Sequence, residues 1–392
     1  FLSLLLVAIL SGLFLGMEPV QIVKSLEKGA ANTLGGLALI ICLGAILGKT
    51  LEIGGAAEKI AVTLINGFGQ KYIQWAVLLT GFLIGLPLYY NAGFVILVPL
   101  VFSIAKRANL PLLYVAIPMA ASLSTTHCFL PPHPSPVFLV NSLKADMGRT
   151  LIFGLIITLP AVVVAGPFLG RILKRFSNLV DSTYIIAEPQ PGKSSPAALP
   201  SFTIGLLPVL LITLAVLADI FLATGTLRTL LLFIGDPTIA LLLSVFIAIW
   251  YFGLRAGYPM ETCMKWLSDA ISGIAVILLI ITAGGIFKQV LQDSGTDKYI
   301  AAFSDKWNMP PLLFGWVVTA MLRVAIGSAT VAGITAAGVV TPLVAAGSVS
   351  PELMVLAVGS GSVFGSHIND SGFWMFKEFF NLSLKQTFLS WT

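Results

Sequence analysis

Charged residues are scarce in this chain of 392 residues, because Asp, Glu, Lys and Arg together make up only 10% of it. A typical soluble domain is roughly 25% charged, and a soluble fold of this size would need far more polar surface. Hydrophobic residues make up 57% of the chain. This composition excludes a soluble globular protein and predicts an all-α polytopic membrane protein.

Cysteine and histidine are also rare, with three residues of each. Cys42, Cys128 and Cys263 are too scattered for a disulfide framework or a zinc site, and we expect them to pack as small hydrophobic side chains. The histidines show no HExxH spacing. We therefore expect no metal and no cofactor. An enzyme is disfavoured too, because no nucleophile–base or metal constellation is convincing.

The positive charge of the chain is modest, with 22 Lys and Arg against 17 Asp and Glu. In a membrane protein such an excess fits cytoplasmic loops that carry Lys and Arg. It therefore does not point to nucleic acid as a partner. The partner that the composition predicts is the lipid bilayer.

Long apolar runs fill most of the chain and allow about 10 to 12 membrane elements at roughly 20 residues per span. The segment 171–200 differs, because it is rich in proline and basic residues and has no long apolar run. Its basic cluster directly follows a span, so we interpret it as a cytoplasmic linker. The sequence thus predicts an N-terminal membrane half at 1–170 and a C-terminal membrane half at 201–392.

The two halves resemble each other in two places. Residues 44–61 align without a gap with 284–301, and residues 111–127 align with 351–367, both at an offset of 240 residues. The shared offset predicts an internal repeat, which we expect to be inverted. Secondary transporters are commonly built from two related halves, with the substrate between them near the bilayer midplane.

The first polar site lies in the apolar segment 85–100, where Pro87, Gly93 and Pro99 interrupt the helical pattern around Asn91. Pro and Gly at membrane depth indicate a broken helix or re-entrant hairpin, which is tolerated where the backbone lines a cavity. Asn91 would then contact a ligand at the hairpin tip. The alternative is a kinked helix whose Asn91 bonds to a neighbouring helix.

The second polar site is the segment 122–136, which contains no Asp, Glu, Lys or Arg but has four prolines near its end. Because proline interrupts the interior of a helix, we expect a non-helical loop that lines a pore. The alternative is a turn outside the membrane. The polar residues of this segment include Ser122, Ser124, Thr125, Thr126, His127 and His133.

The third polar site surrounds Arg323, which is the only charged residue between Lys306 and Glu352. Its planar guanidinium matches a carboxylate in two parallel hydrogen bonds, so Arg323 is the natural partner of an anion. The small residues at 327–330 predict a break in the helix next to it. The alternative is an arginine that extends towards the membrane surface.

The fourth polar site is the segment 359–378, where His367, Asn369 and Asp370 follow alternating Gly and Ser residues. A buried His or Asp can bind and release a proton as its surroundings change. This gives a chemical route to proton coupling. The alternative is a polar cap at the start of a helix.

Four motifs carry a resemblance to a known family. They are PLYYNAGFVILVPLVF at 87–102, THCFLPPHPSP at 126–136, RVAIGSATVA at 323–332 and GSHINDSGFWMFKE at 365–378. The chain resembles the gluconate permease family of bacterial sugar-acid:proton symporters, within the ion transporter superfamily, over nearly its whole length. The resemblance implies a multi-pass carrier of the bacterial inner membrane that imports gluconate or a related small hydroxy-carboxylate with protons. It also implies a homodimer, and further helices before Phe1 and after Thr392.

The chain departs from the family's pattern at two positions. Members commonly carry an acidic residue where this chain has Asn91, and their PPHPGP motif becomes PPHPSP here at Ser135. If that acid takes part in proton coupling in other members, Asn91 cannot do so here. Coupling would then fall on Asp370, Asp219 or a histidine.

We therefore predict a secondary active transporter that works by alternating access, with Arg323 and nearby backbone amides on the substrate carboxylate. His127, His367 and Asp370 are candidates for proton coupling or gating. The alternatives are another small carboxylate, such as one resembling D-serine, sodium as the coupling ion, and a passive channel. The other predicted substrate-binding side chains are Asn91, Ser124, Thr125, Thr126, His133, Ser328, Thr330 and Asn369.

Overall fold

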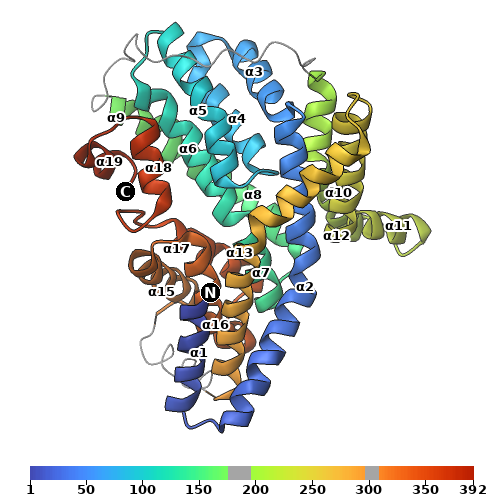
Figure 1. The fold of residues 1–392 in the computed structure, drawn as a ribbon, viewed down its shortest axis with the longest axis vertical. Helices are drawn as coiled ribbons and strands as arrows, with labels where there is room; N and C mark the ends of the chain where they lie inside the picture. The colour runs from blue at the N-terminus through green and yellow to red at the C-terminus, as the bar shows by residue number, and fades with distance from the viewer. Residues whose placement is uncertain (175–195, 296–308) are drawn as a thin grey trace. The chain divides into compact units, whose positions relative to one another are not determined.

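The computed structural model describes residues 1–174, 196–295 and 309–392, and the regular secondary structure in these ranges is helical (Figure 1). The all-α prediction is thus confirmed. Most of the predicted linker, 175–195, lies outside the described residues. Helices reach into both of its ends, because α9 continues to Leu173 and α10 begins at Ala198.

The helices have the following bounds in chain order. The first part of the chain forms α1 (Leu2–Phe14), α2 (Pro19–Ile53), α3 (Ala56–Phe68), η1 (Gln70–Tyr72), α4 (Ile73–Gly85), α5 (Tyr90–Arg107), α6 (Leu112–Phe129), α7 (Pro134–Leu143), α8 (Met147–Val163), η2 (Val164–Phe168) and α9 (Leu169–Leu173). The remainder forms α10 (Ala198–Phe221), α11 (Thr226–Ile234), α12 (Pro237–Ala248), η4 (Ile249–Leu254), α13 (Met260–Asp293), α15 (Pro311–Ile326), α16 (Ala329–Ala345), α17 (Pro351–Val363), α18 (Ser371–Phe379) and α19 (Leu384–Ser390).

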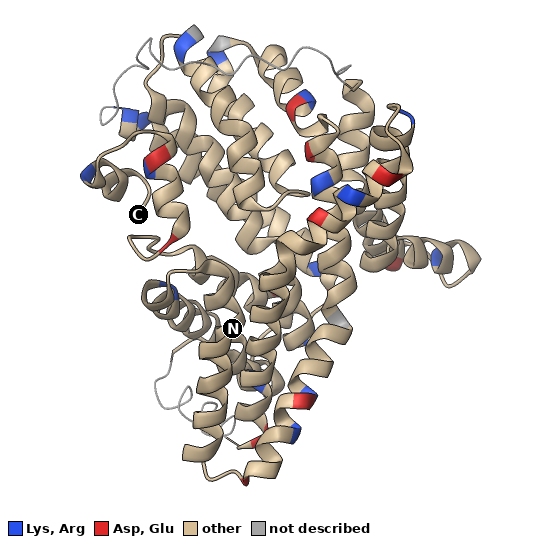
Figure 2. Cartoon of the chain, in the orientation of Figure 1, with Lys and Arg blue, Asp and Glu red and all other residues tan. Residues whose placement is uncertain are grey.

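Many of these helices are suited to a lipid environment. Five helical stretches of the described chain are long and apolar enough to cross a membrane, or up to six if the bent parts of α2 count as one span. Six shorter apolar helices of 10–17 residues accompany them. Charged residues are sparse along the helices (Figure 2). Since a helix satisfies its own backbone hydrogen bonds, this is the architecture that lipid permits.

The helices form two compact units, each assembled from separate stretches of chain. Unit 1 comprises residues 1–42, 128–154 and 272–371, and unit 2 comprises residues 43–127, 155–271 and 372–392. Long helices such as α2 and α13 begin in one unit and end in the other. Each unit therefore takes residues from both sides of the predicted linker. The division into halves by sequence stays a prediction.

Unit 1 is packed through glycine residues at its helix interfaces. A Cβ on Gly361 of α17 would lie 2.5 Å from the carbonyl oxygen of Trp316 on α15. A Cβ on Gly29 of α2 would lie 2.7 Å from the Cα of Ile286 on α13. Small residues let membrane helices approach closely, and this contact replaces the hydrophobic driving force that lipid does not supply.

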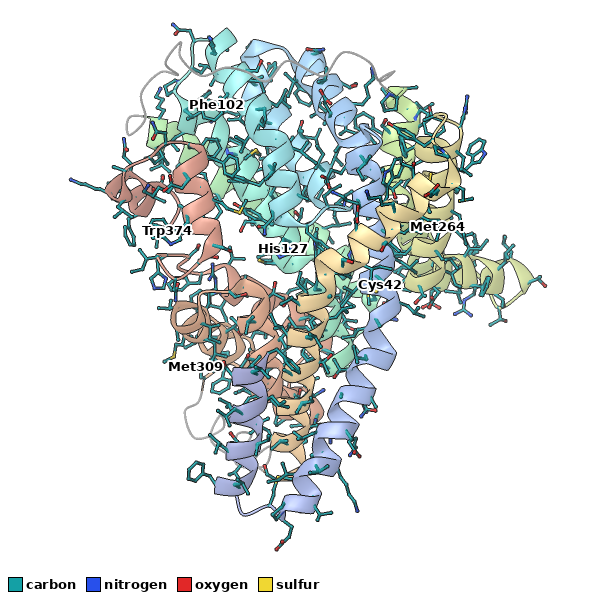
Figure 3. All side chains as sticks on the ribbon, viewed as in Figure 1. Cys42, Phe102, His127, Met264, Met309 and Trp374 are labelled. Carbon is teal, nitrogen blue, oxygen red and sulfur yellow. The ribbon has the colours of Figure 1, made fainter. Side chains whose placement is uncertain are left out.

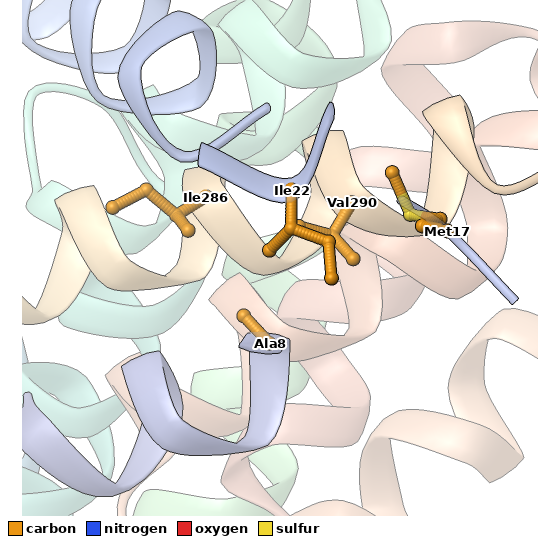
Figure 4. Packing of buried hydrophobic residues seen from close by; sticks show 5 residues of the cluster. All are labelled: Ala8, Met17, Ile22, Ile286 and Val290. Atoms are coloured by element: carbon orange, nitrogen blue, oxygen red, sulfur yellow. The ribbon is translucent and has the colours of Figure 1, made fainter. Parts of the chain in front are cut away.

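An apolar cluster joins α1, α2 and α13 within unit 1 (Figure 4). It consists of Ala8, Met17, Ile22, Ile286 and Val290, all less than one-tenth exposed. The cluster packs the first helix of the chain against the later part of α13. Sequence positions more than 260 residues apart are thereby held in one core.

Unit 2 contains the packed helices α3, α4, α5, α10, α11 and α12. The C-terminal helices contact α5 through aromatic rings. The ring of Phe94 lies 5.6 Å from that of Phe380, and the ring of Phe102, labelled in Figure 3, lies 5.8 Å from the same Phe380 ring. Edge-to-face and tilted pairs of this kind add to the packing energy of the buried area.

Helix bounds recur along the chain at the offset found in the sequence. A shift of 240 residues carries the bounds of α4 and α5 to within two residues of those of α15 and α16. Each pair is interrupted, at 86–89 and at 327–328 respectively. These bounds are compatible with the predicted repeat, which stays a prediction together with its orientation.

The glycine packing of unit 1 gives a testable prediction. Gly361→Ala places a methyl group against backbone atoms of α15, and we expect it to lower the stability of the purified protein by about 1–3 kcal/mol. Gly273→Ala on α13 is the matched control, because nothing lies within 4 Å of its Cβ position. The control should be neutral or slightly stabilising, since alanine is the better helix former. Thermal unfolding in detergent measures both, and equal stability of the two variants would contradict the close contact.

Candidate functional site

The arginine singled out in the sequence lies at the end of an interrupted helix in unit 1. Helix α15 ends at Ile326, and Gly327 has a φ of 82°, in the left-handed region. Helix α16 then begins after Ser328, whose Oγ accepts a hydrogen bond from Val331 N at 3.3 Å. A left-handed glycine after the last turn and a serine before the first are usual helix ends. The predicted helix break next to Arg323 is confirmed.

The loop between α17 and α18 is attached to this break. The Asn369 side chain donates from Nδ2 to the carbonyl oxygen of Val324 at 2.8 Å and more weakly to that of Ala325 at 3.4 Å. It thereby satisfies carbonyl groups that the end of α15 leaves unpaired. A Cβ on Gly327 would collide with the backbone oxygen of Asn369. Only glycine fits here, for reasons of both space and φ.

Arg323 and Asp370 form a buried ion pair. Arg323 is 3% exposed, and its Nη2 contacts Asp370 Oδ2, which also accepts a hydrogen bond from Ser366 Oγ. The Asp370 side chain is only 13% exposed. A charge buried away from water is retained where a partner compensates it. The alternative of an arginine extended to a membrane surface is disfavoured by this burial.

Two guanidinium nitrogens of Arg323 have no partner among the residues that the structure describes. Nε and Nη1 are buried and make no hydrogen bond within the described ranges. Together they carry three of the five N–H donors of the side chain. An unsatisfied buried donor costs roughly 1–3 kcal/mol. Arg323 thus presents donors for a second acceptor, and a carboxylate fits a guanidinium best.

Two residues near this pair were missed by the sequence analysis. Cys128, which was expected only to pack, hydrogen-bonds with Ser362 and interacts electrostatically with both Arg323 and Asp370. Ser366 binds the carboxylate of Asp370 directly. Ser366 lies four residues before Asp370, a spacing that could have drawn attention to it. Nothing in the local sequence connects Cys128 with a charge almost 200 residues away.

The other predicted residues of unit 1 lie close to helix ends. His133 is 1% exposed and immediately precedes α7. Thr330 is half-buried in the first turn of α16, and half-buried His367 has its Nδ1 3.0 Å from the carbonyl oxygen of Gly365. In the described ranges, no three His, Cys, Asp or Glu side chains form a group that could hold a metal ion.

The structure corrects the prediction of a non-helical loop at 122–136. Ser124, Thr125, Thr126 and His127 lie in the last turns of α6, which continues to Phe129, so the non-helical prediction is wrong there. The first proline of the cluster comes only at 131, after these residues. Residues 130–133 separate α6 from α7, which begins at Pro134. Proline is favoured at the first position of a helix, because the N–H that it lacks would have no partner within the helix.

The threonine hydroxyls of α6, in unit 2, bond to their own helix. Thr125 Oγ1 donates to the Ala121 carbonyl at 2.6 Å, and Thr126 Oγ1 donates to the Ser122 carbonyl at 2.9 Å. Their oxygen lone pairs remain available as acceptors. Ser124 is half-buried on the same helix.

His127, labelled in Figure 3, also lies in unit 2 and contacts two tyrosines. The centroid of its ring is 6.4 Å from that of Tyr89, edge to face, and 6.5 Å from that of Tyr90. These tyrosines flank the start of α5, and Asn91 is exposed in its first turn. The predicted interruption within 85–100 is confirmed between Gly85 and Tyr90, whereas Gly93 and Pro99 lie inside α5 without ending it.

The whole chain, residues 1–392, matches the family model described as GntP family permease. The chain belongs to this family. It is 49% identical over 393 residues to the "High-affinity gluconate transporter" of Escherichia coli (strain K12), covering all of this chain and 90% of that relative. It is 45% identical over 393 residues to the "Gnt-II system L-idonate transporter" of the same strain, with the same coverage. The "Gluconate permease" of Bacillus subtilis (strain 168) is 40% identical over 404 residues, again with 100% and 90% coverage. The protein is therefore a multi-pass membrane transporter and not an enzyme.

Solved structures show a similar fold. The YdaH transporter of Alcanivorax borkumensis matches with a TM-score of 0.74 at 17% identity, covering 99% of this chain and 92% of that one. MtrF of Neisseria gonorrhoeae matches with a TM-score of 0.62 at 16% identity, covering 95% of this chain and 79% of that one. At these identities the likeness concerns the fold alone, and it is the fold of membrane transporters.

The contact between Gly327 and Asn369 can be tested by a pair of alanine variants. Gly327 and Gly347 both have positive φ values, but nothing lies within 4 Å of the Cβ position of Gly347. Both Gly327→Ala and Gly347→Ala carry the left-handed backbone strain of about 1–2 kcal/mol. Gly327→Ala should lose more stability, because it also displaces the loop that carries Asp370. Thermal unfolding in detergent compares them, and an equal loss would mean that the loop does not press on Gly327.

Proposed function

We propose that this GntP-family permease imports gluconate, or a similar small hydroxy-carboxylate such as idonate, together with protons by alternating access. The observation that carries the proposal is Arg323, a nearly fully buried arginine with two guanidinium nitrogens that no group of the described residues binds. The relatives named as gluconate and L-idonate transporters match the whole chain, which supports a sugar acid as the substrate class. The bacterial inner membrane is the location that such an uptake system requires.

The carboxylate of the substrate binds Arg323 in this proposal. A guanidinium and a carboxylate form charge-assisted hydrogen bonds, which are roughly twice as strong as neutral ones. The helix break beside Arg323 adds polar groups within the same unit. Ser328 and Thr330 at the start of α16, together with Asn369 on the attached loop, would bind the substrate's hydroxyl groups.

The assignments of the remaining predicted ligands are part of the same proposal. His133 belongs to unit 1, whereas the binding residues predicted in unit 2 are Asn91, Ser124, Thr125 and Thr126. The half-buried or buried hydroxyls on α6 could accept hydrogen bonds from a polyhydroxylated substrate.

Proton coupling is assigned to Asp370 rather than to its rivals. The carboxylate of Asp370 forms an ion pair with the buried guanidinium of Arg323. The charge of Asp370 therefore directly affects how strongly Arg323 binds another anion. Asp219 pairs with Arg228 and is 40% exposed in its side chain, as expected for a structural pair. His127 and His367 are the other candidates, and the homodimer implied by the resemblance is a further proposal.

The proposal is tested with purified protein in liposomes and labelled gluconate. A pH gradient, acidic outside, should drive uptake above the external concentration, whereas an equal sodium gradient at constant pH should not. Uptake above the external concentration with the sodium gradient alone would show that sodium, and not the proton, is the coupling ion. Flux without accumulation under either gradient would support a passive channel. Competition by other carboxylates, including idonate and D-serine, identifies the preferred substrate.

Arg323→Lys provides a direct test of the carboxylate site. Lysine keeps the charge but not the planar array of donors. The hydrogen bonds lost to a charged group are worth roughly 1.5–3 kcal/mol, so uptake at low substrate concentration should fall by about tenfold to a hundredfold.

Arg228→Lys is the matched control for this substitution. It changes an arginine that is also paired with an aspartate, but its side chain is 28% exposed against 4% for Arg323. The control should transport gluconate at the wild-type rate in the same liposome assay. Near-normal uptake by Arg323→Lys would show that the substrate carboxylate binds elsewhere.

A further inference from the structure

We propose that Asp370 and the carboxylate of the substrate compete for the charge of Arg323, so that each bound substrate anion is accompanied by one proton on Asp370. This inference rests on the proposed function, because it needs an anionic substrate at Arg323. It goes beyond that function by giving the number of protons per substrate and the physical reason for the coupling.

The first step of the argument is the position of the Asp370 carboxylate. Its Oδ2 contacts Nη2 of Arg323 and accepts a hydrogen bond from Ser366 Oγ. The Asn369 amide holds the same loop on the last carbonyl groups of α15. The loop that carries Asp370 is thus held beside Arg323 by the Asn369 contact as well, and this contact does not depend on the charge of Asp370.

The second step concerns the charges that surround the pair. Arg323 is the only ionisable residue of α15, and the sequences of α7 and α16 contain none. Helix α17 has Glu352 at its first turn, where Ser350 Oγ and the Asp146 N–H bond to it.

Two further titratable residues of the described ranges belong to the same region: Cys128, which interacts electrostatically with both partners, and His367 on the same loop. A thiol and an imidazole add no fixed negative charge when neutral. The pair is therefore balanced as one cation against one anion.

The third step is the balance of charge when the substrate binds. A substrate anion beside an ionised Asp370 would place two carboxylates on one guanidinium in a buried site. Two carboxylates that share such a site do not both remain ionised, because each raises the proton affinity of the other. The substrate carboxylate stays ionised on Arg323, and the proton binds to Asp370.

The resulting step conserves charge and protons. Before binding, the site contains Arg323 as a cation and Asp370 as an anion. A proton from the side where the substrate enters binds to the Asp370 carboxylate. The substrate carboxylate then takes the place of the Asp370 carboxylate on the guanidinium of Arg323. On release, the substrate leaves, Asp370 loses the proton to the other side, and the ion pair forms again.

Titration of gluconate binding against pH tests this linkage without transport. Calorimetry on the detergent-purified protein should show the affinity of the wild type rising as the pH falls, by up to about tenfold per pH unit for one proton taken up. Binding should take up about one proton per gluconate, measured from the dependence of the heat on buffer ionisation.

Asp370→Asn is the decisive variant. It removes the competing charge and the proton acceptor, so its affinity for gluconate should be high at every pH, with no proton taken up. Asp293→Asn is the matched control in unit 1, because Asp293 also accepts a hydrogen bond from a serine, Ser25, and pairs with a cation, Lys28. The control should keep the pH dependence of the wild type.

Two results would overturn the inference. One is an Asp370→Asn variant that binds gluconate with the wild-type pH dependence. The other is loss of that dependence in Asp219→Asn or His367→Gln instead. If Asp370→Asn does not fold, Asp370→Glu supplies the test, because it keeps an acid and should keep the proton uptake. Failure of the wild type to bind gluconate or any competing hydroxy-acid would contradict the proposed function, which separates that outcome from failure of the linkage.

Discussion

The arrangement of unit 1 depends on the need to compensate one buried positive charge. Arg323 lies in a helix that contains no other ionisable residue, and its side chain is almost completely removed from water. Such a charge is costly unless an anion lies against it. The helix break at Gly327, the amide of Asn369 and the hydroxyl of Ser366 all serve to place Asp370 there. The loop between α17 and α18 is thus fixed to the end of α15 by polar contacts, and Phe364 of the same loop packs against Trp316 of α15.

The helices of unit 1 are held together in a different way. In lipid, apolar side chains gain little by meeting one another, so helices associate where their backbones come close. Gly361 against Trp316 and Gly29 against Ile286 provide such approaches within unit 1. The polar pair is therefore embedded in a framework whose geometry is set by backbone contact. A framework of this kind can hold a guanidinium within the narrow geometric limits that recognition of a carboxylate requires.

The sequence predicted those features that follow from local pattern. Scarcity of charge predicted the helical membrane fold, the small residues after Arg323 predicted the helix break, and the four motifs predicted the family. It failed where the outcome depends on tertiary contacts. The proline cluster suggested a loop through His127, but α6 ends only just before the prolines. Local sequence does not reveal the pairing of Arg323 with Asp370, because the two residues are 47 positions apart. It does not reveal the interaction of Cys128 with Arg323 either, because these residues are almost 200 positions apart.

The neutrality of the Arg323–Asp370 pair has a consequence for the return of the empty carrier. Work done by a membrane voltage is proportional to the net charge that crosses the field, about 2.3 kcal/mol per elementary charge at 100 mV. The ion pair carries no net charge. In the alternating-access cycle proposed above, the empty site can therefore turn from the inner to the outer face with no electrical work against an inside-negative potential. A lone buried arginine would be held at the negative side and would slow every turnover of the carrier.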